Sequence, residues 1–405
     1  MNFKCPYCGG SRLEHLRNCP KVYNIINKKQ FNEKAKKDYF GESPNVFVGR
    51  YGYPRVNVGI LSNEDIKKDH DSPKTWAGDN YKIPDIVNLR SELINSRFRM
   101  DVKTFDQKFL DVTQEVSMLK KPVDVEINLN KKPAFNINYN QDITPYGPSV
   151  KLEKAKITEN VSIPKAVDKV VSDDDLKAKN AMNYLYDKGY DEHFLTKVIS
   201  AGNLGVKQER KLVPTRWSIT ATDDMIGKKL IDEVNDFSMI QDYSIHFGGY
   251  LGNNYLIAFF PDSWSYELFE NYIGDPKNPD PSVFETGTDF EGYYGRKTYA
   301  TNTVGGYYAT RLAILEHLKR NKRKSTVLAL RFITDEYWMP LGVWVVREAT
   351  RKALANKPLK LNSKEEVLRY IELFIRRKFS FKFDDIKSKS KLIKNLMMQK
   401  KLFEF

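Results

Sequence analysis

The sequence predicts an α+β protein with mixed or antiparallel sheets and packed helices. Strand-like and helix-like segments alternate along it, without the regular spacing of a parallel βαβ chain. Hydrophobic residues make up 41% and aromatic residues 13% of the 405 residues, which is enough for buried cores. No run of about 18 apolar residues occurs, so we predict no transmembrane helix. The N-terminus lacks the apolar stretch of a secretory signal, so we expect a cytoplasmic, soluble protein.

In the first hundred residues, turn residues and the spacing of apolar residues predict the secondary structure. Residues 21–39 are basic and compatible with a helix. Val46–Ser62 (VFVGRYGYPRVNVGILS) predicts a hairpin, because β-branched and aromatic residues flank a turn with two glycines and a proline. Residues 83–99 predict a helix with one apolar stripe, formed by Ile86, Leu89, Leu93, Ile94 and Phe98.

The middle of the chain predicts shorter elements. Residues 105–119 are compatible with a helix, and the strict alternation of Val123–Leu129 predicts a strand. Residues 131–173 are polar and punctuated by prolines, which indicates a long connection or a partial domain boundary. Residues 173–200 predict two short helices joined at Gly189.

In the second half, Trp217–Thr222 (WSITAT) predicts a strand, followed by a helix over residues 225–237. Residues 243–260 predict a β-hairpin with glycine turn chemistry. Further helices are predicted over 307–320, 343–354 and 364–378. The apolar segment Ser325–Ile333 predicts a strand at the centre of a sheet.

These elements suggest four regions. We expect a zinc-binding module over 1–20, an N-terminal α+β region over 21–172, a C-terminal α+β region over 173–386, and an extended tail over 387–405.

The charge favours polyanionic partners. The net charge is +14 with a pI near 9.3, and neutralising phosphates releases counterions and adds affinity. With 52 acidic residues also present, a lysine-rich surface that only keeps the protein soluble is the alternative.

All three cysteines lie near the N-terminus, in a pattern typical of a metal site. Cys5 and Cys8 form a CxxC knuckle, and His15 and Cys19 follow at a spacing that places both on one face of a helical turn. Four nitrogen and sulfur ligands suit a closed, structural Zn²⁺ site. A redox CxxC is the alternative, but no thioredoxin-like pattern surrounds it.

The C-terminal heptapeptide QKKLFEF resembles the peptide with which replication and repair proteins bind a DNA sliding clamp. Leu402 and Phe405 are three residues apart, so a 3₁₀ turn would point both into one hydrophobic pocket. Gln399 can hydrogen-bond beside that pocket, and Phe403 can supply part of the contact of the missing second aromatic residue. The alternative is an ordinary terminal helix that packs on its own domain.

Lys211–Asp224 (KLVPTRWSITATDD) resembles the archaeal Nre (novel repair) DNA-repair proteins. The segments PVDVE, IHFGG, FFPDSW and DEYWMPLG resemble the same family, as does the layout of an N-terminal cysteine cluster and a C-terminal clamp peptide. The resemblance implies a role in DNA-damage repair and association with the sliding clamp PCNA through Gln399, Leu402, Phe403 and Phe405. It implies no reaction on particular residues.

Catalytic residues are harder to assign. Asp223 and Asp224, after the predicted strand, could bind Mg²⁺ or Mn²⁺ for phosphodiester chemistry, but Asp in this position more often caps a helix. His246 could act as a base, or it could be an ordinary sheet histidine.

A basic and aromatic set is suited to phosphate contact and base stacking. It consists of Arg216, Trp217, Arg296, Lys297 and Arg311. Three functions therefore stay open: a clamp-tethered DNA-repair factor without chemistry of its own, a metal-dependent enzyme acting on nucleic acid or a nucleotide, and an RNA-processing factor.

Overall fold

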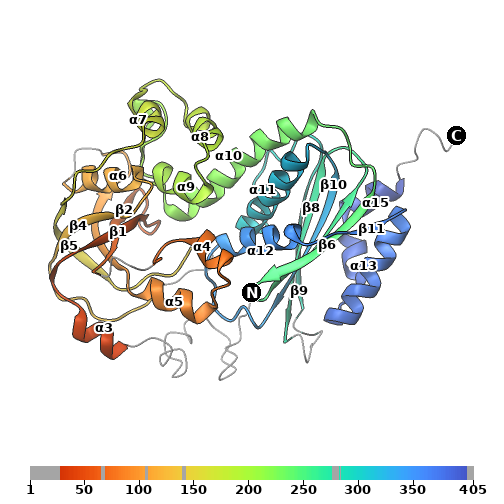
Figure 1. Ribbon diagram of the computed structural model, residues 1–405, viewed down its shortest axis with the longest axis horizontal. Coiled ribbons are helices and arrows are strands. Elements are labelled where there is room, and N and C mark those ends of the chain that lie inside the picture. The colour runs from red at the N-terminus through yellow and green to blue at the C-terminus, as the bar shows by residue number, and fades with distance from the viewer. Residues whose placement is uncertain are drawn as a thin grey trace. The chain divides into compact units, whose positions relative to one another are not determined.

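The computed structural model describes residues 28–64, 69–104, 108–138, 143–275, 282 and 284–398. The chain forms two compact units (Figure 1). Within the described residues, the barrel unit comprises residues up to Ile226 together with Pro340–Gly342, and the sheet unit comprises the rest from Gly227 onward. The predicted boundary at residue 172 lies inside the barrel unit.

The barrel unit is built around a closed five-stranded barrel. Its strands are β1 (Asp38–Val48), β2 (Arg55–Asn63), β3 (Ile94–Asp101), β4 (Val123–Leu129) and β5 (Ser149–Ile157). The strand order is β1-β2-β3-β5-β4, and β4 pairs with β1 to close the barrel. All neighbours are antiparallel except β3 and β5, which are parallel.

Alternation along each strand separates the interior of the barrel from its outer face. β4 reads buried at every second residue, as its sequence predicted. The interior is filled mainly by apolar side chains. They include Tyr39, Val46, Val48, Val56, Val58, Ile60, Met100, Val125, Ile127 and Leu152.

Helices surround the barrel. In chain order they are α3 (Lys28–Lys34), α4 (Pro73–Gly78), α5 (Ile83–Ser91), α6 (Leu110–Met118), α7 (Lys165–Ser172), α8 (Ala178–Asp187), α9 (Glu192–Ser200) and the 3₁₀ turn Lys207–Glu209. The helix α6 connects β3 to β4. The predicted junction of two helices at Gly189 is confirmed, because Gly189 lies between α8 and α9 at φ +83°.

Three expectations for this unit were wrong. The predicted helix over 83–99 ends at Ser91, and its second half is β3. The stretch 131–173, predicted as a connection, contains β5 and α7. Residues 217–222, predicted as a strand, lie in α10 (Thr215–Asn235). Pairing with β2 and β5 overrides local helical spacing in the first case, and burial of a helix face overrides β-branched residues in the last.

The sheet unit contains a six-stranded mixed sheet with the order β11-β6-β7-β10-β8-β9. Its strands are β6 (Tyr243–Tyr250), β7 (Asn253–Phe260), β8 (Ser265–Gly274), β9 (Glu285–Glu291), β10 (Thr326–Thr334) and β11 (Leu359–Leu361). The predicted central strand is confirmed: β10 is buried at every position and lies between β7 and β8. The predicted hairpin is β6–β7.

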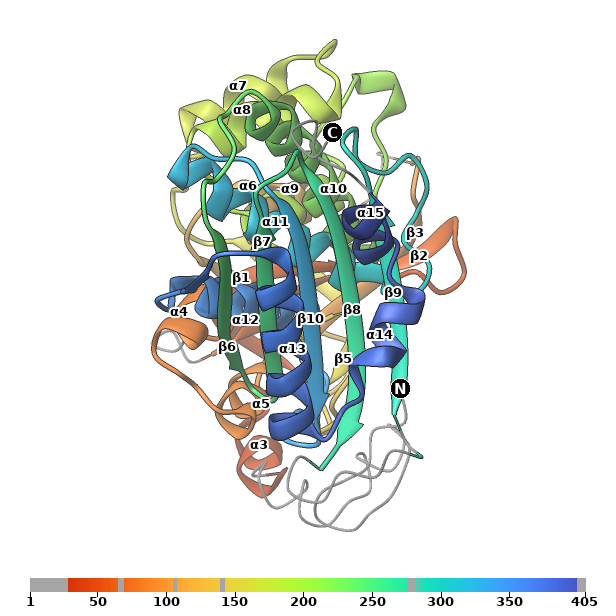
Figure 2. The ribbon, with the colours of Figure 1, turned by 90° about the vertical axis from the view of Figure 1, so that its right-hand side faces the viewer.

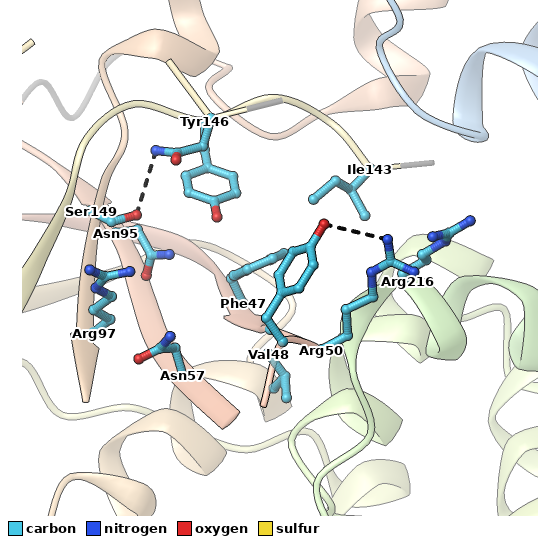
Figure 3. A pocket seen from close by; sticks show the side chains of 13 residues that line it. Phe47, Val48, Arg50, Asn57, Asn95, Arg97, Ile143, Tyr146, Ser149 and Arg216 are labelled. Atoms are coloured by element: carbon cyan, nitrogen blue, oxygen red, sulfur yellow. Dashed lines mark hydrogen bonds between the residues drawn. The ribbon is translucent and has the colours of Figure 1, made fainter. Parts of the chain in front are cut away.

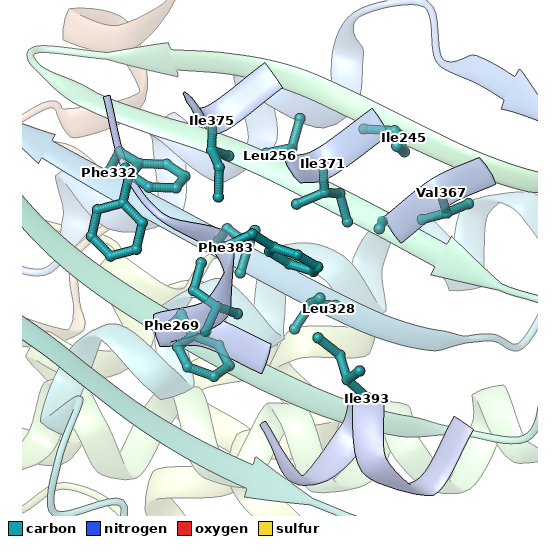
Figure 4. Packing of buried hydrophobic residues seen from close by; sticks show 14 of the residues in the cluster. Ile245, Leu256, Phe269, Leu328, Phe332, Val367, Ile371, Ile375, Phe383 and Ile393 are labelled. Atoms are coloured by element: carbon teal, nitrogen blue, oxygen red, sulfur yellow. The ribbon is translucent and has the colours of Figure 1, made fainter. Parts of the chain in front are cut away.

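Helices cover this sheet. They are α11 (Val304–Asn321), α12 (Trp344–Ala355), α13 (Lys364–Phe379), α14 (Phe383–Lys389) and α15 (Lys391–Met398). Figure 2 shows α13, α14 and α15 across one face of the sheet. Figure 4 shows side chains of α13 packed against Leu256, Leu328 and Phe332 of the strands. Tyr255, on the opposite face of β7, shares a hydrogen bond of 2.9 Å with Thr310 of α11.

The described part of the predicted tail is folded. Residues 387–398 complete α14 and form α15, whose Leu392 and Ile393 are buried against the sheet, so the tail is not extended there. The buried Glu267 of β8 accepts hydrogen bonds from the backbone amides of Lys391 and Leu392, both at 3.0 Å. No helix in the described part of the chain combines the length and apolar character needed to cross a membrane.

Candidate nucleic-acid interface

A cavity of about 270 Å³ lies on the outer face of the barrel, over β1, β2, β3 and β5 (Figure 3). Its floor comes from outward-facing positions that the strand register brings side by side. Phe47 of β1 is paired with Gly59 of β2, and Gly59 is paired with Arg97 of β3. Asn95 of β3 is paired with Ser149 of β5. Residues distant in sequence therefore share one surface.

Gly59 is required by the close approach of the Asn95 side chain. A Cβ atom added to Gly59 would lie 1.8 Å from Oδ1 of Asn95. Asn95 is 3% exposed and its Oδ1 has no hydrogen-bond partner among the residues that the structure describes. A polar ligand or a water molecule could satisfy this acceptor.

Two loops wall the cavity. The loop between β1 and β2 supplies Arg50 and Tyr51, and the guanidinium carbon of Arg50 lies 5.1 Å from the centre of the Tyr51 ring. The connection from β4 to β5 supplies Asn138, Ile143 and Tyr146. Asn138 and Tyr146 exchange two backbone hydrogen bonds of 2.7 and 2.9 Å, which hold that connection in place.

Aromatic rings meet at the cavity. The centre of the Tyr146 ring lies 4.8 Å from that of Phe47. Burial raises the pKa of Tyr146, although hydrogen bonds with Asn95 and Ser149 and the charge of Arg97 act in the opposite direction. The phenol is therefore neutral at physiological pH and can both donate and accept a hydrogen bond.

The start of α10 completes the cavity with Arg216, which the sequence singled out for phosphate contact. The hydroxyl of Thr215 accepts a hydrogen bond of 2.9 Å from the backbone amide of Val48, which fixes this helix end beside β1. Trp217 is 44% exposed, and its ring lies 5.1 Å from that of Tyr53 in the β1–β2 loop.

The lining is electropositive. Arg50, Arg97 and Arg216 are its charged members, and no carboxylate occurs among the described residues that line it. Guanidinium groups bind phosphate oxygens through two parallel N–H donors. The combination of arginines, aromatic rings and amide side chains can therefore contact both the backbone and the bases of a nucleic acid.

The other predicted nucleic-acid residues belong to the sheet unit and do not line this cavity. Arg311 is fully buried and pairs with the equally buried Glu291 at 2.8 Å. Arg296 pairs with Asp289 at 3.0 Å and donates to backbone carbonyls of Phe290, Thr298 and Tyr299. Both guanidinium groups are thus engaged within the unit, whereas Lys297 is exposed.

The structure does not place the predicted catalytic residues in one site. Asp223 is buried and Asp224 half-buried in the middle of α10, so neither follows a strand nor caps a helix. His246 lies in β6 of the sheet unit, and its Nδ1–H donates to the carbonyl oxygen of Asn356 at 3.0 Å. Within the described residues, no group of three or more His, Cys, Asp or Glu side chains is placed to bind a metal ion.

The barrel unit contains a second cavity, of about 380 Å³, beside a network that the sequence did not reveal. The buried carboxylate of Asp71 lies 2.7 Å from Nη1 of Arg90 and 2.9 Å from Nε2 of His193, and it accepts a further hydrogen bond from Asn45. Burial lowers the pKa of the neighbouring Lys197 to about 8. This network joins the loop before α4 to α5, α9 and β1.

Both terminal motifs lie outside the described residues. These are the predicted zinc ligands Cys5, Cys8, His15 and Cys19 and the clamp-peptide residues Gln399, Leu402, Phe403 and Phe405. Asn95 and Arg97 were missed because the helix predicted over 83–99 hid β3. Only the alternation of residues 94–101 signalled a strand there. Asn57 lies on β2, within the hairpin predicted over Val46–Ser62, but nothing in the sequence paired that strand with β3.

The sequence is similar to known proteins over nearly its whole length. The family described as "Archaeal Nre, N-terminal" matches residues 13–275, and "Archaeal Nre, C-terminal" matches residues 291–405. A "DNA repair protein NreA" from Haloferax volcanii is 38% identical over 350 residues, covering 82% of this chain and 83% of that protein.

Two proteins of Archaeoglobus fulgidus are also similar. "DNA repair protein NreB" is 36% identical, covering 91% of this chain and 92% of that protein. "DNA repair protein NreA" is 34% identical, covering 91% and 93%. No solved structure matches. Together with the family matches to both halves, these similarities establish that the chain belongs to the archaeal Nre family.

Proposed function

We propose that this protein is a DNA-repair factor that contacts DNA through the arginine-lined cavity of its barrel unit and is held at the sliding clamp by its C-terminal peptide. The cavity is the observation that carries the proposal, because three arginines and several aromatic rings face one surface with no acidic residue among its described lining. The net charge of +14 supports a polyanionic partner. DNA repair is proposed as the process because the similar proteins are named DNA repair proteins.

DNA affinity tests the first part. The full chain is titrated against labelled single-stranded, duplex and branched DNA at several salt concentrations. We expect binding that weakens steeply with salt, because phosphate neutralisation releases counterions. An absence of binding to every DNA form would refute DNA contact.

Clamp recruitment by the tail is supported by the sequence motif and by the folded segment that precedes it. The helix α15 ends at Met398, directly before Gln399, so the motif follows a helix that packs on the sheet. Deleting residues 399–405 removes the motif without removing any residue of α15.

We expect the deletion variant and the double variant Leu402→Ala/Phe405→Ala to lose binding to the archaeal clamp PCNA in surface plasmon resonance. Met398→Ala is the matched control, since this apolar side chain is 76% exposed and precedes the motif. Unchanged clamp affinity in the deletion variant would refute recruitment through the tail.

We also propose that Cys5, Cys8, His15 and Cys19 hold one structural Zn²⁺, because their spacing suits a closed tetrahedral site. We expect close to one zinc per chain by elemental analysis, and a loss of that zinc in Cys5→Ser. A purified protein without zinc would refute the site.

A further inference from the structure

We infer that the barrel cavity takes unpaired nucleotides of single-stranded DNA, with bases entering over β2 and β3 and phosphates lying against Arg50, Arg97 and Arg216. This inference rests on the proposed DNA contact and names its substrate. Three independent features carry it: the connectivity of the barrel, the position of the cavity on it, and the chemistry of the lining.

The connectivity is that of the OB-fold. The order β1-β2-β3-β5-β4, the parallel β3–β5 pair and the helix α6 between β3 and β4 reproduce the five-stranded Greek-key barrel that binds oligonucleotides and oligosaccharides. Fold likeness alone does not establish a ligand. The fold does indicate where a ligand would bind. Ligands of such barrels lie on the face formed by strands 2 and 3, between the loop that joins strands 1 and 2 and the loop that joins strands 4 and 5.

The cavity lies at that place. Asn57 comes from β2, Asn95 and Arg97 come from β3, and all three are outward-facing. Arg50 and Tyr51 come from the β1–β2 loop, and Tyr146 belongs to the β4–β5 connection. The position follows from strand register and loop placement, independently of which side chains are present.

The lining distinguishes a nucleic acid from a sugar polymer. An uncharged oligosaccharide gives no role to three arginines, whereas a phosphodiester backbone does. Side-chain amides such as those of Asn57 and Asn95 carry both donors and acceptors, which suits base edges. One of these acceptors, Oδ1 of Asn95, has no hydrogen-bond partner within the described part of the chain.

Exposed aromatic rings at the rim favour unpaired bases. Tyr51, which lines the cavity, is 74% exposed. Tyr53 of the same loop and Trp217, the residue after Arg216, are both 44% exposed and form a ring pair. Bases stack on such rings only when they are not already stacked in a duplex. A cavity of about 270 Å³ can hold a single flat base but is too small for a double helix. A protein that binds duplex DNA instead inserts its own helix or strands into a groove of the DNA.

The test measures the affinity of the full-length chain for a fluorescein-labelled thymidine oligonucleotide of about 12 residues, a length within the usual site of one OB barrel. A blunt duplex of equal length and a uridine ribo-oligonucleotide are the comparison arms. We expect single-stranded DNA to bind at least about tenfold more tightly than the duplex, since each stacked base contributes roughly 5- to 150-fold in affinity.

Variants locate the site. We expect Tyr51→Ala and Arg97→Gln, both at exposed positions, to weaken single-strand binding roughly tenfold each. Matched controls are Tyr294→Ala, an 88% exposed tyrosine of the sheet unit, and Lys154→Gln, an exposed cation of β5 outside the cavity. The controls should change the affinity less than twofold.

Each contrary result has a distinct meaning. Equal duplex and single-strand affinities, with both lowered by Arg97→Gln, would refute entry of unpaired bases and leave DNA contact at the barrel standing. Site variants that behave like the controls would refute the location. Tighter binding of the ribo-oligonucleotide would refute DNA as the substrate, and no binding of any nucleic acid would refute the proposed DNA contact itself.

Discussion

Replacing Asp71 with asparagine should destabilise the barrel unit strongly, although the side chain keeps its shape. The Asp71 carboxylate is 1% exposed and lies 2.7 Å from Nη1 of Arg90, which is 3% exposed. The substitution leaves a buried guanidinium charge without its counter-charge, and such losses cost about 3–5 kcal/mol. Arg90 keeps hydrogen bonds to the carbonyls of Pro145 at 2.7 Å and His70 at 3.2 Å, so we expect the lower end, about 3 kcal/mol.

An exposed ion pair with nearly the same charge separation shows whether burial, and not distance, sets the cost of losing the carboxylate. Asp174 lies 2.8 Å from Lys207, but the two side chains are 51% and 68% exposed. Asp174→Asn should therefore lower the free energy of unfolding by less than about 1 kcal/mol. Amide hydrogen exchange of peptides from β1, β2 and β3, followed by mass spectrometry, reports the opening free energy of the barrel alone. Equal losses in the two variants would refute the reasoning from burial.

The same network should make the barrel acid-sensitive. Burial by itself would raise the pKa of Asp71, but the charges of His193 and Arg90, with hydrogen bonds from His193 and Asn45, outweigh it and hold the pKa well below its usual range. The ionised group therefore contributes stability that is complete above the unfolded pKa of about 4 and is lost as the pH falls below that value. The exchange experiment repeated between about pH 5 and pH 3 should show a steeper loss in the native chain than in Asp71→Asn. If barrel stability fell with pH equally in the native chain and in Asp71→Asn, the acid sensitivity would not come from Asp71.

Two further substitutions test close contacts. Gly59→Ala forces the Asn95 side chain away from a Cβ that would lie 1.8 Å from its Oδ1, so we expect a loss of about 1–3 kcal/mol and weaker oligonucleotide binding. Gly78→Ala is the control, because a Cβ at this position meets no atom within 4 Å, and it should leave thermal stability unchanged or slightly raised. Equal losses of thermal stability in the two variants would contradict the packing argument. Glu267→Ala removes the carboxylate that accepts the first amides of α15, so limited trypsin digestion should cleave within α15 faster than in the native chain. An unchanged digestion rate would show that burial of the apolar face alone holds this helix.

Much of the local structure was readable in the sequence. The strand over Val123–Leu129 has a strict two-residue alternation that only a half-buried strand satisfies, and it was predicted to the residue. The apolar run that became β10 indicated a strand buried on both faces, and the helices α8, α9, α12 and α13 were predicted within a few residues. These signals are local, because each arises from the spacing of apolar residues along a single helix or strand that faces the core.

Elements whose state depends on distant partners were misread. Residues 94–101 satisfy a helical apolar stripe and a strand alternation together, and pairing with β2 and β5 decides for the strand. In Trp217–Thr222 the β-branched residues favour a strand locally, but Pro214 directly precedes the long helix α10, which begins at Thr215. The missed β3 hid the floor of the cavity, so Arg216 and Trp217 were recognised as nucleic-acid candidates without their neighbours Asn95 and Arg97.

The sequence by itself determined the α+β class, most individual elements, the basic character, the family, and the two terminal motifs on which zinc binding and clamp recruitment are proposed. The tertiary structure alone decided that the barrel closes in an order that places Asn57, Asn95 and Arg97 on one face. It also decided that Arg311 and His246, which the sequence offered as functional, are buried and hydrogen-bonded inside the sheet unit. The physical reason is that strand register and burial depend on contacts between residues far apart in the chain, which no local pattern encodes.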